Sequence, residues 1–359
     1  MTKTALPVRH HPTRRRLLRF ATVGTPALGA ALFDRRLPGM AAAQAQDSAA
    51  TRALSADPQI TVAGPEGGEL DNWARTLIPA LGRLSSPPSP IRRSLAGGID
   101  GVTGANQFTA QALPDGASAL LVPGSAVLGW LRGDPRVQFD ISRWIPLLAG
   151  LSSTVIAGRI DPAQLVRGQK LRIGVSGPIG PEIAALLGLE QLGLHPIPIG
   201  GLVDQMAAEN AFAQHAIDLL LLRGPSIAAA WAATGMRPMC VLGMPDAHGQ
   251  LARDPSIPEV PHLAELLAGL PTDPLTAAWR RTAVAAQMAF GLVLPHLTPA
   301  PLVELWRHAA EHATLTPELQ ALATTQATRL YRPPGALHIF ATDPDILILR
   351  NWIADHPFR

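Results

Sequence analysis

Cysteine, aromatic residues and charged residues are all scarce in this chain of 359 residues. A single cysteine, Cys240, excludes an internal disulfide and a multi-cysteine metal site, and its apolar surroundings in the sequence predict an inert, buried thiol. Aromatic residues make up 4% of the chain, which argues against a surface that stacks on single-stranded nucleic acid. Charged residues make up 16% and hydrophobic residues 47%, so the composition favours a large packed core and allows two domains of ordinary size.

The formal net charge of +3 and the pI near 9.7 come mainly from one end of the chain. Residues 1–45 hold eight basic residues and one acidic residue. The remaining 22 basic and 26 acidic residues leave residues 46–359 with a net charge of −4. Because this larger part is mildly acidic, we expect no nucleic acid or other polyanion as a partner.

Residues 1–45 are predicted to be an export signal that is cleaved after Ala45. The run Thr13-Arg14-Arg15-Arg16-Leu17-Leu18-Arg19 resembles the twin-arginine motif, and a short apolar run follows at 21–33. No later apolar run is long and uncharged enough to span a membrane. We therefore expect a soluble, monomeric, exported protein, periplasmic in a cell with two membranes. The alternative is a disordered basic tail on a cytoplasmic protein.

Strand and helix patterns alternate along the rest of the chain. Apolar runs at 60–63, 91–95 and 119–122 predict strands that are each followed by a helix, which indicates a mostly parallel α/β sheet. Strands at 144–150 and 154–157 would carry the chain out of this unit. Further strands are predicted at 171–175, 196–199, 216–222, 239–243 and 290–294, and later helices at 299–313 and 317–328 with a last one after Asp345.

The stretch 60–75 begins this pattern with a strand, a glycine-bearing turn and a helix. Leu70, Trp73 and Leu77 follow the helical period, so Trp73 is expected in the core. This arrangement places the first N–H groups of the helix at the end of the strand, where they suit a small anion or a carbonyl oxygen. A second Gly/Pro turn at 176–182 follows the strand at 171–175 in the same way.

Five stretches in this order resemble the tripartite tricarboxylate transporter substrate-binding proteins, the TctC or Bug family of extracytoplasmic receptors. The match covers nearly all of the chain after residue 45, and each motif is loose when taken alone. The stretches are 62–75, Pro114-Asp115-Gly116 with its following strand, 173–177, Pro198 with Gly200-Gly201 and 217–219, and 253–261.

The resemblance implies a periplasmic binding protein of type II, with two α/β lobes joined by two hinge crossings and a ligand cleft between them. Lobe 1 would comprise 58–156 and 285–359, lobe 2 would comprise 157–284, and the crossings would lie near Ile156 and Ala285. Such a receptor performs no chemistry, needs no cofactor or metal, and hands a small solute to a membrane transporter or a sensor. Carried over by position, the contacts in the first lobe are Gly67, Gly68, Glu69, Leu70, Asp71, Gly124, Ser125 and Ala126, and those in the second are Ser176, Gly177, Ile179, Gly180, Gly200 and Gly201.

Charged residues depart from the family pattern at the predicted cleft. Glu66 and Glu69 stand where the family has small residues, and two carboxylates at the mouth would repel an anion. Arg223, at the end of a buried strand, could offset them by bidentate pairing with a carboxylate. The predicted solute is therefore a carboxylate held by Arg223, or an amino acid or amide that is cationic or polar at one end.

Three alternatives to the receptor remain open from the residues alone. His308-Ala309-Ala310-Glu311-His312 fits the H-x-x-E-H pattern of inverted zinc proteases, although two solvated histidines on a surface helix are the simpler interpretation. Ser125 and Ser176 follow strands as a hydrolase nucleophile would, but neither lies in G-x-S-x-G, and both are better interpreted as hydroxyl donors or helix caps. The third alternative is a scaffold of the same fold that binds nothing.

Asp71 is favoured as a helix-start residue over a ligand contact.

Overall fold

The computed structural model describes residues 58–83, 90–177, 180–246, 248–267, 274–333, 335–340 and 346–356. The predicted signal, residues 1–45, and the predicted contact Ile179 lie outside these ranges. All described residues belong to one compact unit. None of the described helices is long and apolar enough to cross a membrane.

The first sheet contains the strands predicted at the start of the chain and others that return later. Its strand order is β13-β4-β12-β3-β1-β2. The strands β1, β2 and β3 pair in parallel, whereas β12, β4 and β13 pair antiparallel, so the sheet is mixed and only its βα part is parallel as predicted. The bounds are β1 Gln59–Val62, β2 Arg92–Leu95, β3 Ser118–Val122, β4 Ile145–Ser152, β12 Met288–Leu294 and β13 Thr328–Tyr331.

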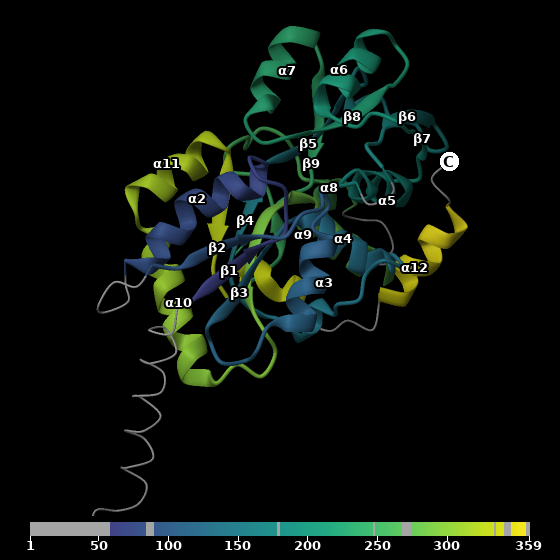
Figure 1. The fold of residues 1–359 in the computed structure, drawn as a ribbon. Helices are drawn as coiled ribbons and strands as arrows, with labels where there is room; N and C mark the ends of the chain where they lie inside the picture. Colours follow the sequence, from purple (N-terminus) through teal and green to yellow (C-terminus); the bar gives the residue numbers. More distant parts are fainter. Residues whose placement is uncertain are drawn as a thin grey trace, which may run out of the picture. The chain divides into compact units, whose positions relative to one another are not determined.

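Helices, among them α2 and α10, pack against this sheet (Figure 1). In α2, Leu70, Trp73 and Leu77 are buried as their spacing predicts, and the Trp73 ring lies 4.8 Å from that of Phe290. This confirms Trp73 as a core residue. The helices of this part are α2 Glu69–Gly82, α3 Val102–Gln111, α4 Gly124–Arg132, α10 Ala300–Thr314, α11 Pro317–Thr325 and α12 Ile346–Asp355, with 3-10 turns η1 Ile141–Arg143 and η3 Gly335–Phe340.

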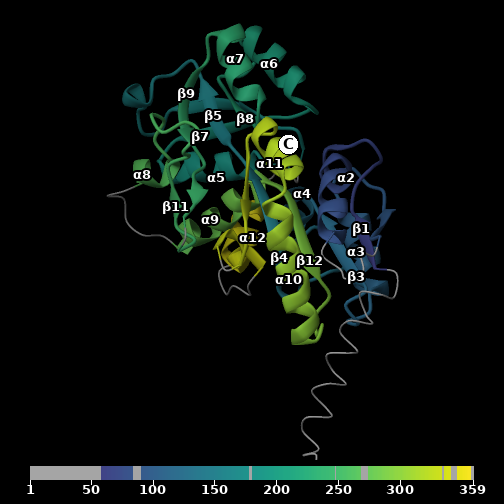
Figure 2. The same ribbon diagram turned by 90° about the vertical axis from the view of Figure 1, so that its left-hand side faces the viewer.

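The second sheet has the order β7-β6-β8-β5-β9, with β7, β6 and β8 parallel and β5 antiparallel to its neighbours. Figure 2 shows it together with α6 and α7. Its strands are β5 Thr154–Gly158, β6 Lys170–Gly174, β7 His195–Ile199, β8 Leu219–Arg223 and β9 Arg237–Val241. The accompanying elements are η2 Pro162–Gln164, α5 Ile183–Gln191, α6 Gln205–Ala213, α7 Ser226–Thr234, the ribbon β10 Met244–Pro245 with β11 Leu251–Ala252, and α8 Leu263–Leu267.

The chain changes sheet twice, which agrees with the predicted two-lobed α/β fold. The first change lies at Ser153, between β4 and β5. There the Ser153 N–H donates to the Ala327 carbonyl at 3.0 Å, and its carbonyl accepts from the Gly224 N–H at 2.8 Å. The return runs through α9, Pro274–Gln287, which continues directly into β12. The lobe bounds 58–156, 157–284 and 285–359 stay a prediction, and the sheets themselves change three residues before Ile156.

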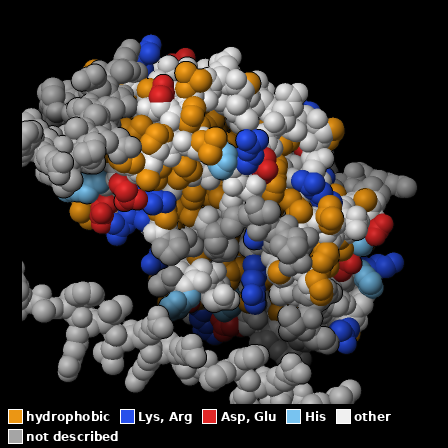
Figure 3. All heavy atoms as spheres, turned by 90° about the horizontal axis from the view of Figure 1, so that it is seen from below, with side chains coloured by type: hydrophobic (Ala, Val, Ile, Leu, Met, Phe, Trp, Pro, Cys, Tyr) orange, Lys and Arg blue, Asp and Glu red, His pale blue; other side chains and the backbone are white. Residues whose placement is uncertain are grey.

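The helix α9 packs against helices of both sheets, because α4 and α5 both contact it. The indole N–H of Trp279 donates to the Ala184 carbonyl at 3.0 Å, and Trp279 is fully buried. On the face of the molecule in Figure 3, basic and acidic side chains are interspersed among apolar ones.

Candidate functional site

Two adjacent cavities lie where strand ends of both sheets meet helix starts. One has a volume of about 470 Å³ and the other about 440 Å³. We call the first the polar cavity, lined by Glu69, Ser152, Gly174, Ser176, Pro181, Glu182, Leu202, Val203, Asp204, Gln205, Ala208, Leu221, Arg223, Gly224, Pro225 and Gln326. We call the second the apolar cavity, lined by Ala63, Gly64, Pro65, Gly68, Glu69, Leu70, Ile99, Pro123, Gly124, Ser125, Leu128, Pro181, Val203, Arg223, Ala285, Ala286, Met288 and Ala289. Because four residues line both, the cavities form one cleft.

The cleft is built from the starts of five helices. Its lining includes the first residues, or those just before them, of α2, α4, α5, α6 and α7. The first N–H groups of a helix have no partner inside the helix and carry partial positive charge, so they attract anions. The chain's own acids already lie at α2, α5 and α6, as Glu69, Glu182 and Asp204. The starts of α4 and α7 carry no acid.

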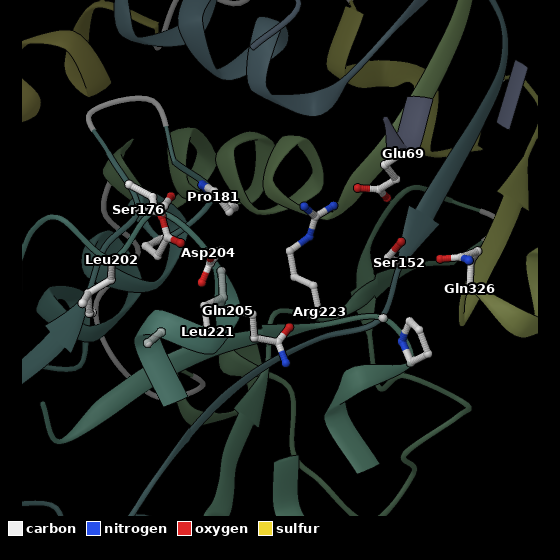
Figure 4. A pocket seen from close by; sticks show the side chains of 16 residues that line it. Glu69, Ser152, Ser176, Pro181, Leu202, Asp204, Gln205, Leu221, Arg223 and Gln326 are labelled. Carbon is white, nitrogen blue, oxygen red and sulfur yellow. Dashed lines mark hydrogen bonds between the residues drawn. The ribbon is translucent and has the colours of Figure 1, made fainter. Parts of the chain in front are cut away.

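Arg223 is the cation of this cleft, and its position follows from strand pairing. It is the last residue of β8 and pairs with Thr154 of β5, next to the first change of sheet. Its side chain reaches into the middle of the polar cavity, with the guanidinium turned toward the side of Glu69 (Figure 4). Its Nε is buried and has no hydrogen-bond partner among the described residues. A buried guanidinium nitrogen without a partner is costly, so this group favours an acceptor from outside the chain.

Three carboxylates surround Arg223 and differ in their bonding. Asp204 caps α6 by accepting from the Ala207 N–H at 2.7 Å. Glu182 accepts from the Ser176 hydroxyl at 3.0 Å. Burial raises the pKa of Glu182 above 4.5, and this outweighs the hydrogen bond from Ser176 and the charge of Arg223, which both lower it. Glu69 is exposed and has no ion-pair partner among the described residues.

Gly124 is required by the close approach of backbone, whereas Gly180 lies close to the ends of two polar side chains. A Cβ on Gly124 would lie 2.2 Å from the Ala285 carbonyl oxygen, so only glycine lets α4 begin against the end of α9. A Cβ on Gly180 would lie 2.2 Å from Glu182 Oε2 and 2.5 Å from Ser176 Oγ. Gly180 therefore leaves room for the Ser176–Glu182 hydrogen bond.

About half of the predicted contacts lie on the cleft. Among the described residues, the cavities include Gly68, Glu69, Leu70, Gly124, Ser125, Ser176 and Arg223. The predicted residues that line neither cavity are Gly67, Asp71, Ala126, Gly177, Gly180, Gly200 and Gly201. Of the two glutamates in question, Glu69 faces the cleft, whereas Glu66 lies 3.7 Å from Arg75 on the surface.

Asp71 is positioned to hold the first turn rather than a ligand. It is fully buried and accepts from the Gly67 N–H at 2.9 Å, from Arg75 at 2.9 Å and from Arg93. Burial raises the pKa of Asp71, but the Gly67 hydrogen bond and the two arginines outweigh this and hold the pKa below 3.8. The helix-start role favoured from the sequence agrees with this bonding.

Sequence reasoning missed several polar residues of the cleft. Ser152, Glu182, Asp204, Gln205 and Gln326 all line the polar cavity. An available signal was their position, because Ser152 ends β4, and Glu182, Asp204 and Gln205 follow strand ends just before or at helix starts. In open α/β sheets ligands bind outside the carboxyl ends of strands, so these loops were candidates.

The residues behind the alternative functions lie away from this cleft or are bonded within the chain. His308 and His312 are exposed on α10, with ring centroids 4.5 Å apart, as the simpler interpretation predicts. Within the described residues no three His, Cys, Asp or Glu side chains come together as metal ligands. The Ser125 hydroxyl donates to the Asp100 carbonyl at 2.9 Å, so both Ser125 and Ser176 are hydroxyl donors. Cys240 is fully buried, as predicted.

Comparison with solved structures finds this fold in solute-binding proteins. A TctC solute-binding protein from Polaromonas, solved without ligand, has a TM-score of 0.62 and 15% identity, covering 83% of this chain and 98% of that one. MatC from Rhodopseudomonas palustris with bound malate has a TM-score of 0.50, 18% identity and coverages of 83% and 95%. Another R. palustris protein, with adipate, has a TM-score of 0.50, 15% identity and coverages of 83% and 96%. No protein-family model matches the sequence, and no curated protein matches it. The fold implied by the sequence resemblance is therefore confirmed.

Proposed function

We propose that this chain, which has the fold of the TctC-type solute-binding proteins, is a receptor that binds a small polar organic solute in the cleft. The solute is a carboxylate, an amino acid or an amide. The observation that carries this proposal is Arg223, whose guanidinium lies in the cleft with a buried Nε that no described residue satisfies. A carboxylate of the solute would complete it with charge-assisted hydrogen bonds, supported by the acid-free start of α7 just after it.

The receptor acts through closure of its two lobes and performs no chemistry. A solute that contacts both sides of the cleft favours the closed form over the open one, because only the closed form makes all its contacts. A membrane transporter or a sensor would recognise that form. Residues 1–45 serve as the export signal, so the mature protein works in the periplasm as a monomer.

A thermal-shift panel on the mature protein tests the receptor, with native mass spectrometry to detect a retained solute. The panel contains dicarboxylates, aromatic acids, amino acids and amides. A solute at one hundred times its dissociation constant stabilises the folded state by about 2.7 kcal/mol, which shifts the melting temperature measurably.

Variants identify the cleft as the binding site. Arg223→Ala is expected to abolish the shift, because it removes the guanidinium that holds the solute. Arg237→Ala, an exposed arginine in the same sheet that lines neither cavity, is the matched control and should keep the full shift. An empty spectrum with a flat panel would contradict the receptor and favour a scaffold that binds nothing. Turnover of a solute would favour an enzyme instead.

A further inference from the structure

One acidic and one basic side chain lie at the boundary between the two cavities. Four residues line both cavities, Glu69, Pro181, Val203 and Arg223, and only Glu69 and Arg223 are charged. Glu69 comes from the first turn of α2, which packs on the first sheet, and Arg223 comes from the end of β8 in the second sheet. Figure 4 shows the Glu69 carboxylate at the level of the guanidinium and turned toward it. No ion pair joins them within the described residues, so both are available to a molecule between them.

The apolar cavity offers almost nothing to a charged group beyond this boundary. Apart from Glu69 and Arg223, its described lining has no charged side chain, and the Ser125 hydroxyl already donates to a carbonyl. Leu70, Leu128 and Met288 form its wall with 5% or less of their surface exposed, and Ile99 and Val203 supply exposed apolar surface, with 92% and 76% exposed. An apolar group of the solute would bury this surface, which stabilises binding in proportion to the apolar area removed from water.

A dicarboxylate fits this charge pattern poorly. With one carboxylate on Arg223, the second would lie in the polar cavity with Glu182 and Asp204, or in the apolar cavity beside Glu69. In the apolar cavity it would meet the first N–H groups of α4, at Gly124 and Ser125, and those of α2, which carries Glu69 in its first turn. In either cavity the second carboxylate would lie near a carboxylate of the chain, and their repulsion disfavours binding when the site is shielded from water.

We propose that the solute is an α-amino acid with an apolar side chain, bound by its carboxylate to Arg223 and by its ammonium to Glu69, with the side chain in the apolar cavity. This rests on the proposed receptor function and names its solute class. An α-amino acid carries its ammonium and carboxylate groups on the same carbon atom, which suits an acidic and a basic side chain that face each other across one boundary. The apolar side chain then extends into the apolar cavity, which has no other charged group in its described lining.

The ammonium contact is tested with solutes that differ only by that group. The pairs are leucine with 4-methylpentanoate and phenylalanine with 3-phenylpropanoate, measured by calorimetry alongside malate and adipate. The wild type is expected to bind one of the two amino acids at least about tenfold more tightly than its partner acid, because charge-assisted hydrogen bonds are the strong ones. Glu69→Gln should remove most of that preference while the partner acid binds as before or better.

The apolar contact is tested at the rim. Ile99→Ser should weaken the same amino acid severalfold and leave alanine unaffected, since alanine has no side chain that reaches Ile99. The matched control is Leu113→Ser. Leu113 is an exposed leucine that lines neither cavity, so this substitution should leave the affinity for the amino acid unchanged.

The outcomes separate this inference from the receptor itself. If malate, adipate or a partner acid binds more tightly than both amino acids, and Arg223→Ala abolishes that binding, the receptor stands and the amino acid class is wrong. The same conclusion follows if Glu69→Gln weakens an amino acid and its partner acid equally. If no solute of the broad panel binds, the proposed function and this inference both fail.

Discussion

Asp71 is a fully buried carboxylate whose partners come from the turn before α2, from α2 itself and from strand β2. It reaches back from the first turn of α2 to the Gly67 N–H, just before the helix start, and pairs with Arg75 and Arg93. Arg93 lies in the neighbouring strand β2. The carboxylate therefore ties the turn, the helix start and the sheet together, and fixes where Glu69 enters the cleft.

Asp71→Asn is expected to destabilise the fold by about 2 to 4 kcal/mol at pH 7, because the arginines lose their charge-assisted partner. The folded-state pKa of Asp71 lies below 3.8, so its contribution is complete above that value and declines as pH falls through the folded-state pKa. Urea unfolding at pH 7 and at pH 3 or below should show the difference between wild type and variant shrinking with acid. An equal difference at both pH values would contradict this. Asp115→Asn, at an exposed turn aspartate, is the control.

Cys240 lies in the interior of β9, where burial raises the pKa of its thiol to about 12. Because the thiolate is the reactive form, the folded protein should not react with a thiol reagent at pH 8. The reagent releases a chromophore when it reacts with a thiol. Its absorbance is measured with the folded protein and again with the protein unfolded in urea. One thiol per chain should react after unfolding, and reaction at the unfolded rate under native conditions would be the opposing result.

The sequence could predict single residues where one local pattern decides their place. Arg223 was found because a buried strand ends at it, and Asp71 because helix starts favour acids. Glu182 was not found, because its role depends on Ser176 and on Gly180, which leaves space for their bond. The position of Glu182 after a strand end marked its loop as a candidate, but its dependence on two neighbours in space has no signature in spacing.

At the scale of elements, predictions succeeded where burial is one-sided. The helix α2 has a clear apolar stripe, and Leu70, Trp73 and Leu77 are buried on it as their spacing predicts. The helix α9 was missed because it is buried on nearly all sides at its end, where every residue from Thr282 to Gln287 is buried, so no stripe marks it. The strand β13 was partly assigned to the preceding helix, which ends at Thr325, three residues before the predicted end.

Two glycines of α4 should respond in opposite ways to the same substitution. Gly124→Ala puts a Cβ 2.2 Å from the Ala285 carbonyl oxygen, which is backbone and cannot rotate away, so a loss of about 1 to 3 kcal/mol is expected. Gly129→Ala meets its nearest neighbour, Val137 Cγ2, at 3.4 Å, and should be neutral or stabilising by up to about 1 kcal/mol through helix propensity. Denaturant midpoints measure both. Equal effects would show that α4 and α9 do not touch as described.

At the scale of the whole molecule, the two-sheet arrangement could be predicted because ordered motifs resemble a known family. The convergence of five helix starts on one cleft could not, since each start is a local feature and only the packing around Ser153 and α9 brings them together. Ser153 is bonded to Ala327 near the first sheet and to Gly224 just after Arg223. A change in angle between the sheets at this residue would therefore move Arg223 relative to Glu69.

Closure of the cleft is expected to bring α2 and α6 closer when a solute binds. Asn72 and Asn210 are exposed on these helices and line neither cavity, so Asn72→Cys with Asn210→Cys gives two labelling sites that leave the cleft intact. The buried Cys240 should remain unlabelled. Energy transfer between the dyes should rise with solute concentration and reach half its maximum at the dissociation constant found by calorimetry, because binding and closure are one equilibrium.

A second pair within one sheet distinguishes closure from a general change in the dyes. Asn72→Cys with Leu315→Cys places both labels on the first-sheet part, where α2 packs against α10 and α11, and its signal should stay constant. Arg223→Ala should abolish the rise in the first pair without altering its starting value, because the variant keeps the open form and loses the solute. A rise in both pairs would indicate a general change in the dyes, and no rise in either at saturating solute would mean that the receptor binds without closing its lobes.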